Sequence, residues 1–301
     1  MIRYHRCPLC DAAGIQQVLT SIDHTVTSET FSIWQCAHCS LRFTQDEPET
    51  NEIGRYYKSE NYISHSETNK GLINWLYLRV RKFTLSSKRN FIEEETGIKK
   101  GRILDIGAGA GAFLHHMKKN GWDAEGLEPD GQARDRAKLE YGLHLQPSSQ
   151  LFSFKEQHFD AITMWHVLEH VHDLHGYINH IKSICKPGGK IIIAVPNYTS
   201  FDAEHYGSSW AAYDVPRHLF HFSPASMQEL MKKHGCTIRK MQPMWFDSFY
   251  VSLLSEKYKT GHSNLIKGFW YGLRSNMKAF SNKRRASSII YVINPAAQLP
   301  A

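Results

Sequence analysis

The chain has 301 residues, 42% of them hydrophobic, and a net charge of +7, enough for one large domain or an ordinary domain with a small module. No apolar run approaches the roughly 20 residues of a membrane-spanning helix, and the first ten residues lack the apolar core of a secretory leader, so we expect a cytoplasmic protein. The charge is uneven, because residues 1–50 hold three basic side chains against six acidic ones, whereas residues 246–301 hold eight against two.

Two cysteine pairs stand near the start of the chain, Cys-Pro-Leu-Cys from residue 7 and Cys-Ala-His-Cys from residue 36. Each pair can present two thiolates to one tetrahedral ion, which is the pattern of a four-cysteine zinc ribbon. We therefore expect residues 1–47 to form a small separate module in which Cys7, Cys10, Cys36 and Cys39 hold a structural Zn²⁺. A redox dithiol is the alternative, although two separate pairs argue against it.

Residues 48–100 are expected to form a mostly helical connector. From Arg102 onward, strands and helices alternate, which predicts an α/β fold with a mostly parallel sheet and helices on both faces. The expected strands are Arg102–Ile106, Asp123–Leu127, Leu143–Gln146, Phe159–Trp165, Lys190–Val195, Cys236–Met241 and Ser287–Ile293. The expected helices between them are Ala112–Asn120, Gly131–Tyr141, His175–Cys185 and Pro224–His234. The whole domain spans residues 101–301, with a helical insertion at about 247–284.

A glycine-rich loop follows the first of these strands. Asp105 ends the strand, and Gly107, Gly109 and Gly111 alternate with alanines before a helix begins. Glycines let the backbone turn tightly beside a ligand, and the N–H groups of the helix N-terminus can bind an anionic group.

An acidic residue, Glu128, follows the second strand, 23 residues after Asp105. A carboxylate at this offset can accept both ribose hydroxyls of a nucleotide. A purely structural turn or an NAD site is the alternative. The spacing Asp-x-Gly-x-Gly-x-Gly argues against the NAD site, whose pattern is Gly-x-Gly-x-x-Gly.

These motifs resemble the class I S-adenosylmethionine (SAM) methyltransferases, and within them the branch of the ubiquinone-biosynthesis O-methyltransferases. The resemblance covers residues 101–243 closely, and it rests on Leu104 to Gly111, Glu128, Phe159-Asp160, the run His166-Val167-Leu168-Glu169-His170, and Lys186 to Gly189. It implies a Rossmann-like seven-stranded sheet in the order 3-2-1-4-5-7-6, with strand 7 antiparallel.

The family resemblance also implies which residues surround SAM. Asp105 would face the methionine ammonium, the glycine loop the carboxylate, and Glu128 the ribose. Trp165 and His166, just after the fourth strand, would border SAM and the acceptor. The upstream aromatic residues Tyr56, Tyr57 and Tyr62 resemble those that cover SAM in relatives, with simple packing as the alternative. The complete set expected at the cofactor is Asp105, Gly107, Ala108, Gly109, Gly111, Glu128, Pro129, Trp165, His166 and Tyr57.

Several histidines are candidate bases, because a base helps methyl transfer to a hydroxyl or a carbon acid, and histidine titrates near neutral pH. His166 and His170 are four residues apart after the fourth strand; we expect His166 to border the transfer site, and capping or surface roles are the alternative. His218 and His221 lie in an aromatic stretch after the fifth strand. Either one is a base in a substrate loop, or both are buried residues that pin that loop.

The methyl acceptor is expected to be a small molecule, methylated on oxygen or carbon: a sugar, a quinone or a lipid-linked intermediate. The alternative is an RNA methyltransferase that docks through the zinc ribbon, but an acidic module argues against a nucleic-acid partner. A binding module without catalysis is a third interpretation. Residues 262–285 mix aromatic and basic side chains, as in a lid, a solvated helix or an amphipathic helix that contacts an anionic membrane.

Overall fold

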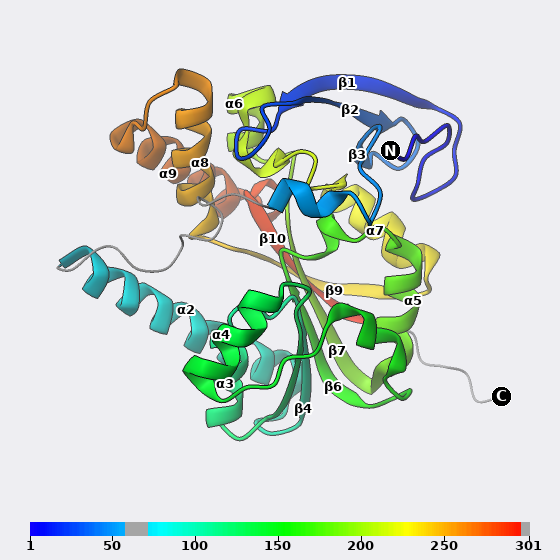
Figure 1. Cartoon of the computed structure of the whole chain (residues 1–301), viewed down its shortest axis with the longest axis vertical. Helices are drawn as coiled ribbons and strands as arrows, with labels where there is room; N and C mark the ends of the chain where they lie inside the picture. The colour runs from blue at the N-terminus through cyan, green and yellow to red at the C-terminus, as the bar shows by residue number, and fades with distance from the viewer. Residues whose placement is uncertain (58–71, 296–301) are drawn as a thin grey trace.

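The larger of two β-sheets has six strands in the order β5–β4–β6–β7–β10–β9 (Figure 1). They are β4 (Arg102–Ile106), β5 (Asp123–Leu127), β6 (Phe159–Trp165), β7 (Cys185–Pro196), β9 (Thr237–Pro243) and β10 (Ser288–Asn294). The first four in this order are parallel, whereas β10 pairs antiparallel with both β7 and β9. This computed structural model describes residues 1–57 and 72–295, without the side chains of residues 72–82.

The expected third strand is the one correction to this sheet. In place of a strand at Leu143–Gln146, the structure has a single parallel bridge between Leu127 and Gln146. The N–H of Glu128 donates to the carbonyl oxygen of Gln146 at 2.8 Å, so the segment does lie at the sheet edge. Pro147 follows at once and has no N–H to donate, so the ladder ends there. The other six strands, including the antiparallel last one, lie in the expected order.

Helices cover both faces of the sheet: α2 (Leu72–Thr96), α3 (Ala112–Lys119), α4 (Gly131–Tyr141), α5 (Leu174–Ile184), α6 (Phe201–Tyr206), α7 (Pro224–Lys233), α8 (Asp247–Thr260) and α9 (Leu265–Ser281). Short 3-10 turns are η1 (Ile53–Tyr57), η2 (Ser148–Ser153), η3 (Leu168–His170), η4 (Gly207–Ser209), η5 (Ala211–Tyr213) and η6 (Lys283–Arg285). Successive side chains of a strand point to opposite faces. Ile103 therefore packs in one core with Ile92 of α2, whereas Leu104 packs in the other with Ile178 of α5.

The smaller sheet has the order β1–β2–β3–β8. β1 (Ile15–Ile22), β2 (Thr30–Cys36) and β3 (Arg42–Thr44) come from the N-terminal residues, whereas β8 (Phe220–His221) comes from the segment that follows β7. Arg42 pairs with His221 and Phe43 with Phe220. Leu9 and Cys36 also belong to the same buried cluster as Leu104. The N-terminal residues therefore share both a sheet and a core with the rest of the chain, and the boundary at residue 47 stays a prediction.

Between β9 and β10, the helices α8 and α9 form a hairpin at one edge of the molecule (Figure 1). They occupy the segment that was expected to be a helical insertion. Across the residues described, no helix combines the length and the apolar character that crossing a membrane requires.

Candidate active site

The loop between β4 and α3 is shaped by its glycines. Gly107, Gly109 and Gly111 have φ angles of 75°, 55° and 80°, which side chains other than glycine rarely adopt. A Cβ on Gly107 would collide with the side chain of Val167, whereas nothing lies within 4 Å of a Cβ built on Gly109. The middle of the loop therefore leaves open space above its backbone, as a bound ligand requires.

Glu128 is 8% exposed and faces this loop from the end of β5. One carboxylate oxygen accepts the N–H of Gly109 at 2.8 Å, and the other accepts the N–H of Asp130 at 2.9 Å. Burial raises the pKa of Glu128. Arg134 donates to the carbonyl oxygens of Glu128 and Pro129, at 2.7 and 2.8 Å, and so holds the turn that presents the carboxylate.

Asp105 is buried at the end of β4, where the hydroxyl of Thr163 donates to its carboxylate at 2.6 Å. Burial raises the pKa of Asp105 to about 7. Lys88 of α2 reaches the same region, with its ammonium 3.9 Å from the centroid of the Trp165 ring. Burial lowers the pKa of Lys88, although the charge of Asp105 opposes this effect. Sequence reasoning missed Lys88, because one lysine among several on a long helix has no distinguishing signal.

Trp165 ends β6 beside this group. Its ring meets Phe113 edge to face, with 5.8 Å between centroids. The indole N–H is buried and has no hydrogen-bond partner among the residues described. A buried donor without a partner is costly, so it is available to a ligand.

His166 lies between two carboxylates. Its Nε2 is 2.8 Å from Asp247 Oδ2, and its Nδ1 is 3.3 Å from Glu169 Oε1. Burial alone would lower the pKa of His166, but Asp247 and Glu169 outweigh it and raise the pKa to about 10. The ring is therefore cationic near neutral pH and has no free lone pair to accept a proton. Asp247, at the start of α8, was not predicted, because its partner is 81 residues away in the sequence.

A second polar cluster adjoins His166 through Glu169. One ligand atom each from Glu169, His170 and His218 lies within 4.8 Å of the others. The His170 and His218 rings meet edge to face, with 4.6 Å between centroids. Burial lowers the pKa of His170 to about 4, and the neighbouring His218 adds to this effect. One carboxylate oxygen of Glu169 is buried without a partner in the described part of the chain. Tyr57 touches the cluster through its hydroxyl, 3.0 Å from His170 Nδ1, whereas Tyr62 lies outside the described residues.

His218 and His221 have different surroundings. His218 Nδ1 lies 2.8 Å from the carbonyl oxygen of Ala212, so this nitrogen must carry the proton. The other ring nitrogen, Nε2, lies 4.0 Å from Asp214 Oδ2. His221 belongs to β8, is 4% exposed, and has its Nε2 3.2 Å from the hydroxyl of Thr44. Burial lowers the pKa of His221, and its contacts with Thr44 of β3 and with the Tyr213 ring are those of a packing residue in the smaller sheet.

Arg217 anchors the loop that carries these histidines. Its guanidinium, which is 1% exposed, donates to Asp23 at 2.9 Å and to Asp214 at 2.6 Å. It also donates to the carbonyl oxygen of Tyr56 at 2.8 Å. Asp23 belongs to the N-terminal residues, so one buried cation connects that module, the η1 turn and the histidine loop.

The four expected metal ligands come together. Cys7 Sγ lies 3.5 Å from Cys39 Sγ, and Cys10 Sγ lies 3.6 Å from Cys36 Sγ. All four sulfur atoms are within 4.8 Å of one another. Four thiolates at the Zn–S distance of about 2.3 Å form a tetrahedron with edges of about 3.8 Å. The donor set and the spacing therefore fit one Zn²⁺ ion.

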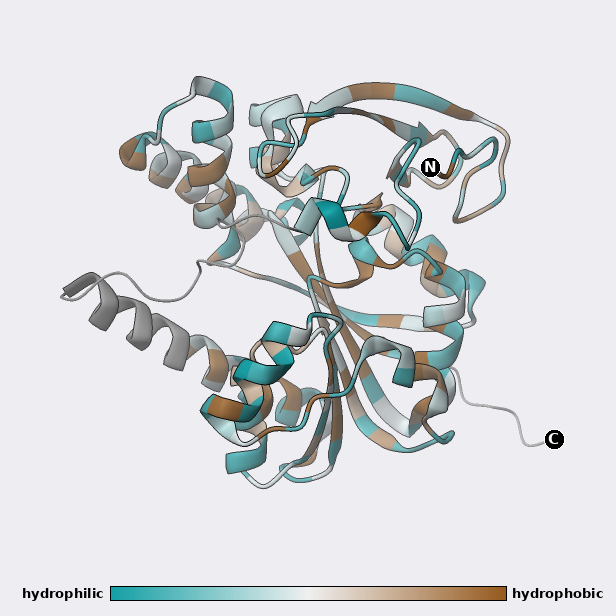
Figure 2. Cartoon of the chain, in the orientation of Figure 1, coloured by the Kyte–Doolittle hydropathy of each residue, from teal (hydrophilic) through white to brown (hydrophobic). Residues whose placement is uncertain are grey.

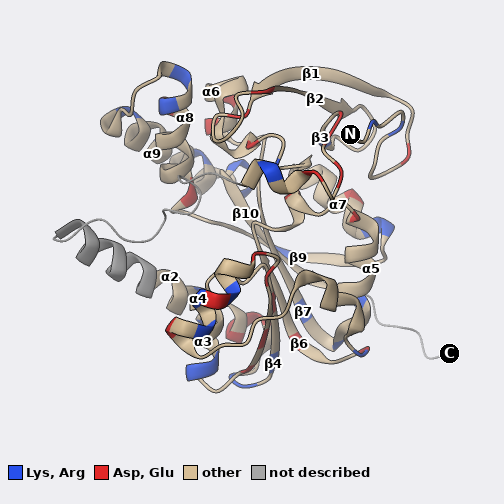
Figure 3. Cartoon of the chain, viewed as in Figure 1, with Lys and Arg blue, Asp and Glu red and all other residues tan. Residues whose placement is uncertain are grey.

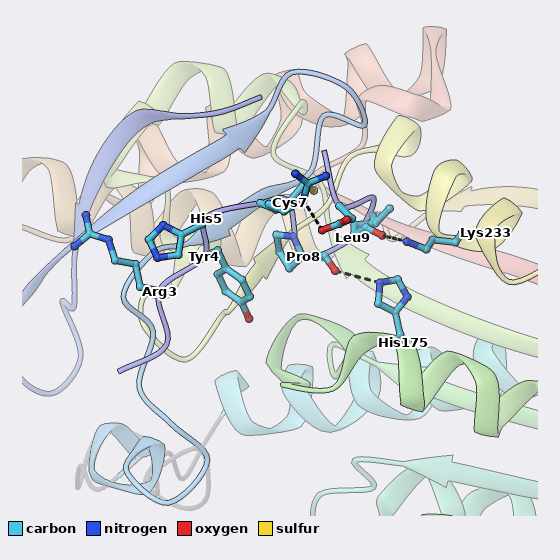
Figure 4. Close-up of a pocket in the computed structure, with 10 residues that line it drawn as sticks. Arg3, Tyr4, His5, Cys7, Pro8, Leu9, His175 and Lys233 are labelled. Atoms are coloured by element: carbon cyan, nitrogen blue, oxygen red, sulfur yellow. Dashed lines mark hydrogen bonds and ion pairs between the residues drawn. The ribbon is translucent and has the colours of Figure 1, made fainter. Parts of the chain in front are cut away.

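Two helices, α5 and α7, contact the backbone of the first cysteine turn. His175 Nε2 of α5 lies 3.1 Å from the carbonyl oxygen of Pro8. Lys233 of α7 donates to the carbonyl oxygen of Leu9 at 2.9 Å. Figure 4 shows both contacts beside Cys7 in a pocket lined mainly by N-terminal residues. The cysteine cluster is thus fastened to two of the helices that cover the larger sheet.

Comparison with known proteins gives one family match, to a methyltransferase domain, over residues 77–241, more than half of the chain. The ubiquinone biosynthesis O-methyltransferase of Aeromonas salmonicida is 27% identical over 183 residues, which cover 56% of this chain and 74% of that protein. The enzyme of the same name from Maricaulis maris is 30% identical over 151 residues, 46% of this chain and 59% of that protein. A SAM-dependent methyltransferase structure from Archaeoglobus fulgidus aligns with 70% of this chain and 94% of its own, at 19% identity and a TM-score of 0.47.

Proposed function

The chain belongs to the methyltransferase-domain family and is a SAM-dependent methyltransferase, and from that premise we propose that it methylates an oxygen atom of a small-molecule acceptor. The observation that carries the proposal is the glycine loop with Glu128 bonded to its backbone at the carboxyl end of the parallel strands, where α/β folds bind nucleotides. The names of the relatives support oxygen as the target. A sugar, a quinone and a lipid-linked intermediate remain the candidate acceptors.

The cofactor residues are proposed from the same geometry. SAM supplies an already activated methyl group when it is bound. Asp105 and Glu128 would accept hydrogen bonds from its ammonium and ribose hydroxyl groups, and the loop from Gly107 to Gly111 would leave room for its carboxylate. Pro129 lies at the same turn, and the unpaired indole N–H of Trp165 offers a further donor. Carboxylates facing a cation and open backbone facing an anion fit the charges of SAM.

We assign the base to His218 rather than to His166. The carbonyl oxygen of Ala212 orients the His218 ring, and Asp214 Oδ2 lies 4.0 Å from its Nε2. In the neutral ring Nε2 is then the nitrogen that can accept a proton from an acceptor hydroxyl, and the Asp214 carboxylate would stabilise the cation that forms. His166 has a pKa raised to about 10 by Asp247 and Glu169, against the effect of burial. Its proposed role is that of a fixed positive charge beside the acceptor. His221 is left out of the mechanism, because Thr44 occupies its ring nitrogen.

The experiment is a panel of hydroxylated quinones, sugars and lipid-linked sugars, assayed with SAM that carries a labelled methyl group. On the acceptor that is found, His218→Ala should lower kcat about 10²- to 10⁴-fold, as loss of a general base does, and leave the affinity for S-adenosylhomocysteine unchanged. His262→Ala, in the exposed turn before α9, is the matched control. A kcat in His218→Ala equal to that of the control would remove His218 from the mechanism.

We also propose that Cys7, Cys10, Cys36 and Cys39 bind a structural Zn²⁺. Four protein ligands leave no open coordination position, so such an ion stabilises the fold and does not take part in the reaction. The contacts of His175 and Lys233 with the first cysteine turn support this role. The alternative of RNA docking gains no support from a module with an acidic balance.

A further inference from the structure

Helix α9 packs on α8 through its smallest residues. Gly268, Gly272, Ser275 and Ala279 are its buried positions, and their spacing of three to four residues places them on one face. A Cβ on Gly272 would lie 2.8 Å from Phe249 Cα. The two helix backbones are therefore so close that no large side chain of α9 fits between them.

The large apolar side chains of α9 consequently point outward. The exposed fractions are Leu265 70%, Ile266 83%, Phe269 57%, Trp270 55%, Met277 63% and Phe280 82%. Their spacing spreads them over one arc of about 140° around the helix. This arc begins beside the small residues, where the Phe269 ring stacks on Phe249 of α8 with 5.1 Å between centroids. We call these six residues the α9 apolar face; Figure 2 shows hydrophobic residues along this hairpin at the edge of the molecule. An apolar surface of this size on a folded chain marks a binding surface.

The charged residues of α9 itself are all basic. After Glu256 the sequence contains no Asp or Glu, whereas it contains eight Lys and Arg residues. Five of the eight lie on the α8–α9 hairpin, where Figure 3 shows blue segments: Lys257, Lys259, Lys267, Arg274 and Lys278. Lys267 and Lys278 of α9 are exposed and form no salt bridge with a residue that the structure describes. The spacing of Lys267, Arg274 and Lys278 places them in one row alongside the apolar face.

The hairpin is also held firmly in place. Ser275 donates to Asp202 at 2.6 Å, and the Tyr271 ring stacks on His205 with 3.7 Å between centroids. Asn276 donates to the carbonyl oxygen of Trp245 at 2.8 Å. The next residue, Phe246, is half-exposed, and its ring meets Phe83 of α2 edge to face, with 6.3 Å between centroids.

We propose that the α9 apolar face docks on an anionic phospholipid surface. Helices that lie in a membrane interface combine a broad apolar face rich in Trp, Phe and Leu with flanking Lys and Arg, and aromatic rings are favoured at that depth. The one-sided positive charge selects an anionic surface over a neutral one. This docking does not depend on which acceptor is methylated, so a failed assay for methyl transfer leaves it standing, and the reverse also holds.

The test is flotation of the full chain with vesicles of phosphatidylglycerol and phosphatidylcholine, compared with phosphatidylcholine alone. At low salt the chain should float with the anionic vesicles only, and about 0.5 M salt should weaken this binding, because ions screen exposed charges. Ile266→Ser combined with Phe280→Ser should reduce the association constant at least tenfold. Lys267→Glu combined with Lys278→Glu should reduce it similarly.

The matched control is Leu139→Ser, because Leu139 is 84% exposed on α4, away from the hairpin. It should float like the parent chain. Equal flotation of the α9 variants and this control would overturn the proposal, as would no flotation with anionic vesicles. A parent chain that is dimeric by light scattering, and monomeric after the Ile266 and Phe280 substitutions, would assign the face to a second copy and also overturn it.

Discussion

Three acids near the glycine loop and His166, of which Asp105 and Glu128 are buried and Asp247 is half-buried, have different pKa shifts because their neighbours differ. Asp105 has a hydroxyl as its close partner, and burial raises its pKa to about 7. Glu128 accepts two backbone N–H groups, yet burial still raises its pKa. For Asp247 burial acts in the same direction, but the cation of His166 outweighs it and lowers the pKa. The pKa of each of these acids therefore depends on its individual contacts as well as on its burial.

The pKa of Asp105 predicts a pH dependence of cofactor binding. Below about pH 7 the buried carboxyl group is protonated in the free protein, and only the carboxylate attracts the ammonium group of the cofactor. The association constant for S-adenosylhomocysteine should therefore fall as pH falls through 7, by up to about tenfold per unit. Calorimetry between pH 6 and 8 measures this. In Asp105→Asn binding should be weaker and the slope should vanish; an unchanged slope would assign the titration to another group.

Arg217 predicts a large effect on stability. Its replacement by Leu would leave Asp23, which is fully buried, and Asp214 without their cation. Losing one member of a buried charge cluster costs about 3–5 kcal/mol, so the free energy of unfolding in urea should fall by that amount. Arg6 pairs with Asp11 at 2.8 Å on the surface, where such pairs contribute at most about 1 kcal/mol. Arg6→Leu is therefore the control, and equal losses in the two variants would contradict the buried cluster.

At the scale of elements, the two cysteine turns are joined to the larger domain rather than suspended from it. Cys7, Cys36 and Cys39 lie in the same buried cluster as residues of β4, β6 and α5. The carbonyl oxygens of Pro8 and Leu9 accept contacts from α5 and α7. A metal bound at these cysteines would consequently stabilise the contacts of α5 and α7 with the first cysteine turn.

Metal removal should therefore affect the whole chain. We expect one zinc per chain by elemental analysis, and a zinc chelator should lower the Tm of the main unfolding transition rather than of a separate early one. Cys36→Ser should lose the zinc, because three thiolates remain. Cys236→Ala is the control, since Cys236 lies outside the cluster and its loss should leave the zinc in place. A zinc content that is equal in both variants would refute the four-cysteine site.

The elements differ in how far the sequence predicts them. β4, β6 and β7 follow from short apolar runs in the sequence. The capping box of α7, with Ser223 and Ser226 exchanging bonds with the backbone, is equally local. Leu143–Gln146 looked like a strand on the same criteria, yet Pro147 limits it to one bridge. β8 has only two residues, which is too short for any periodic signal.

Across the whole molecule, the site residues that the sequence predicts are those that belong to local motifs. Asp105, the glycines, Glu128 and the cysteines each belong to a short pattern of fixed spacing. Lys88, Asp247 and Arg217 were not assigned roles, because each acts through a partner on a distant element. Asp247, at the start of α8, also raises the pKa of His166. We therefore propose a fixed positive charge at this position instead of the base that the sequence suggested.

The pairing of β3 with β8 has a consequence for synthesis on the ribosome. Arg42 pairs with His221, and Asp23 bonds to Arg217, 194 residues further along the chain. The N-terminal sheet therefore cannot close until most of the polypeptide has left the exit tunnel, since its last strand is made so late. Contacts of such long sequence separation slow folding. Until β8 has been synthesised, the edge of β3 is unpaired. A zinc ion that binds early would hold the two cysteine turns together in the nascent chain during that interval.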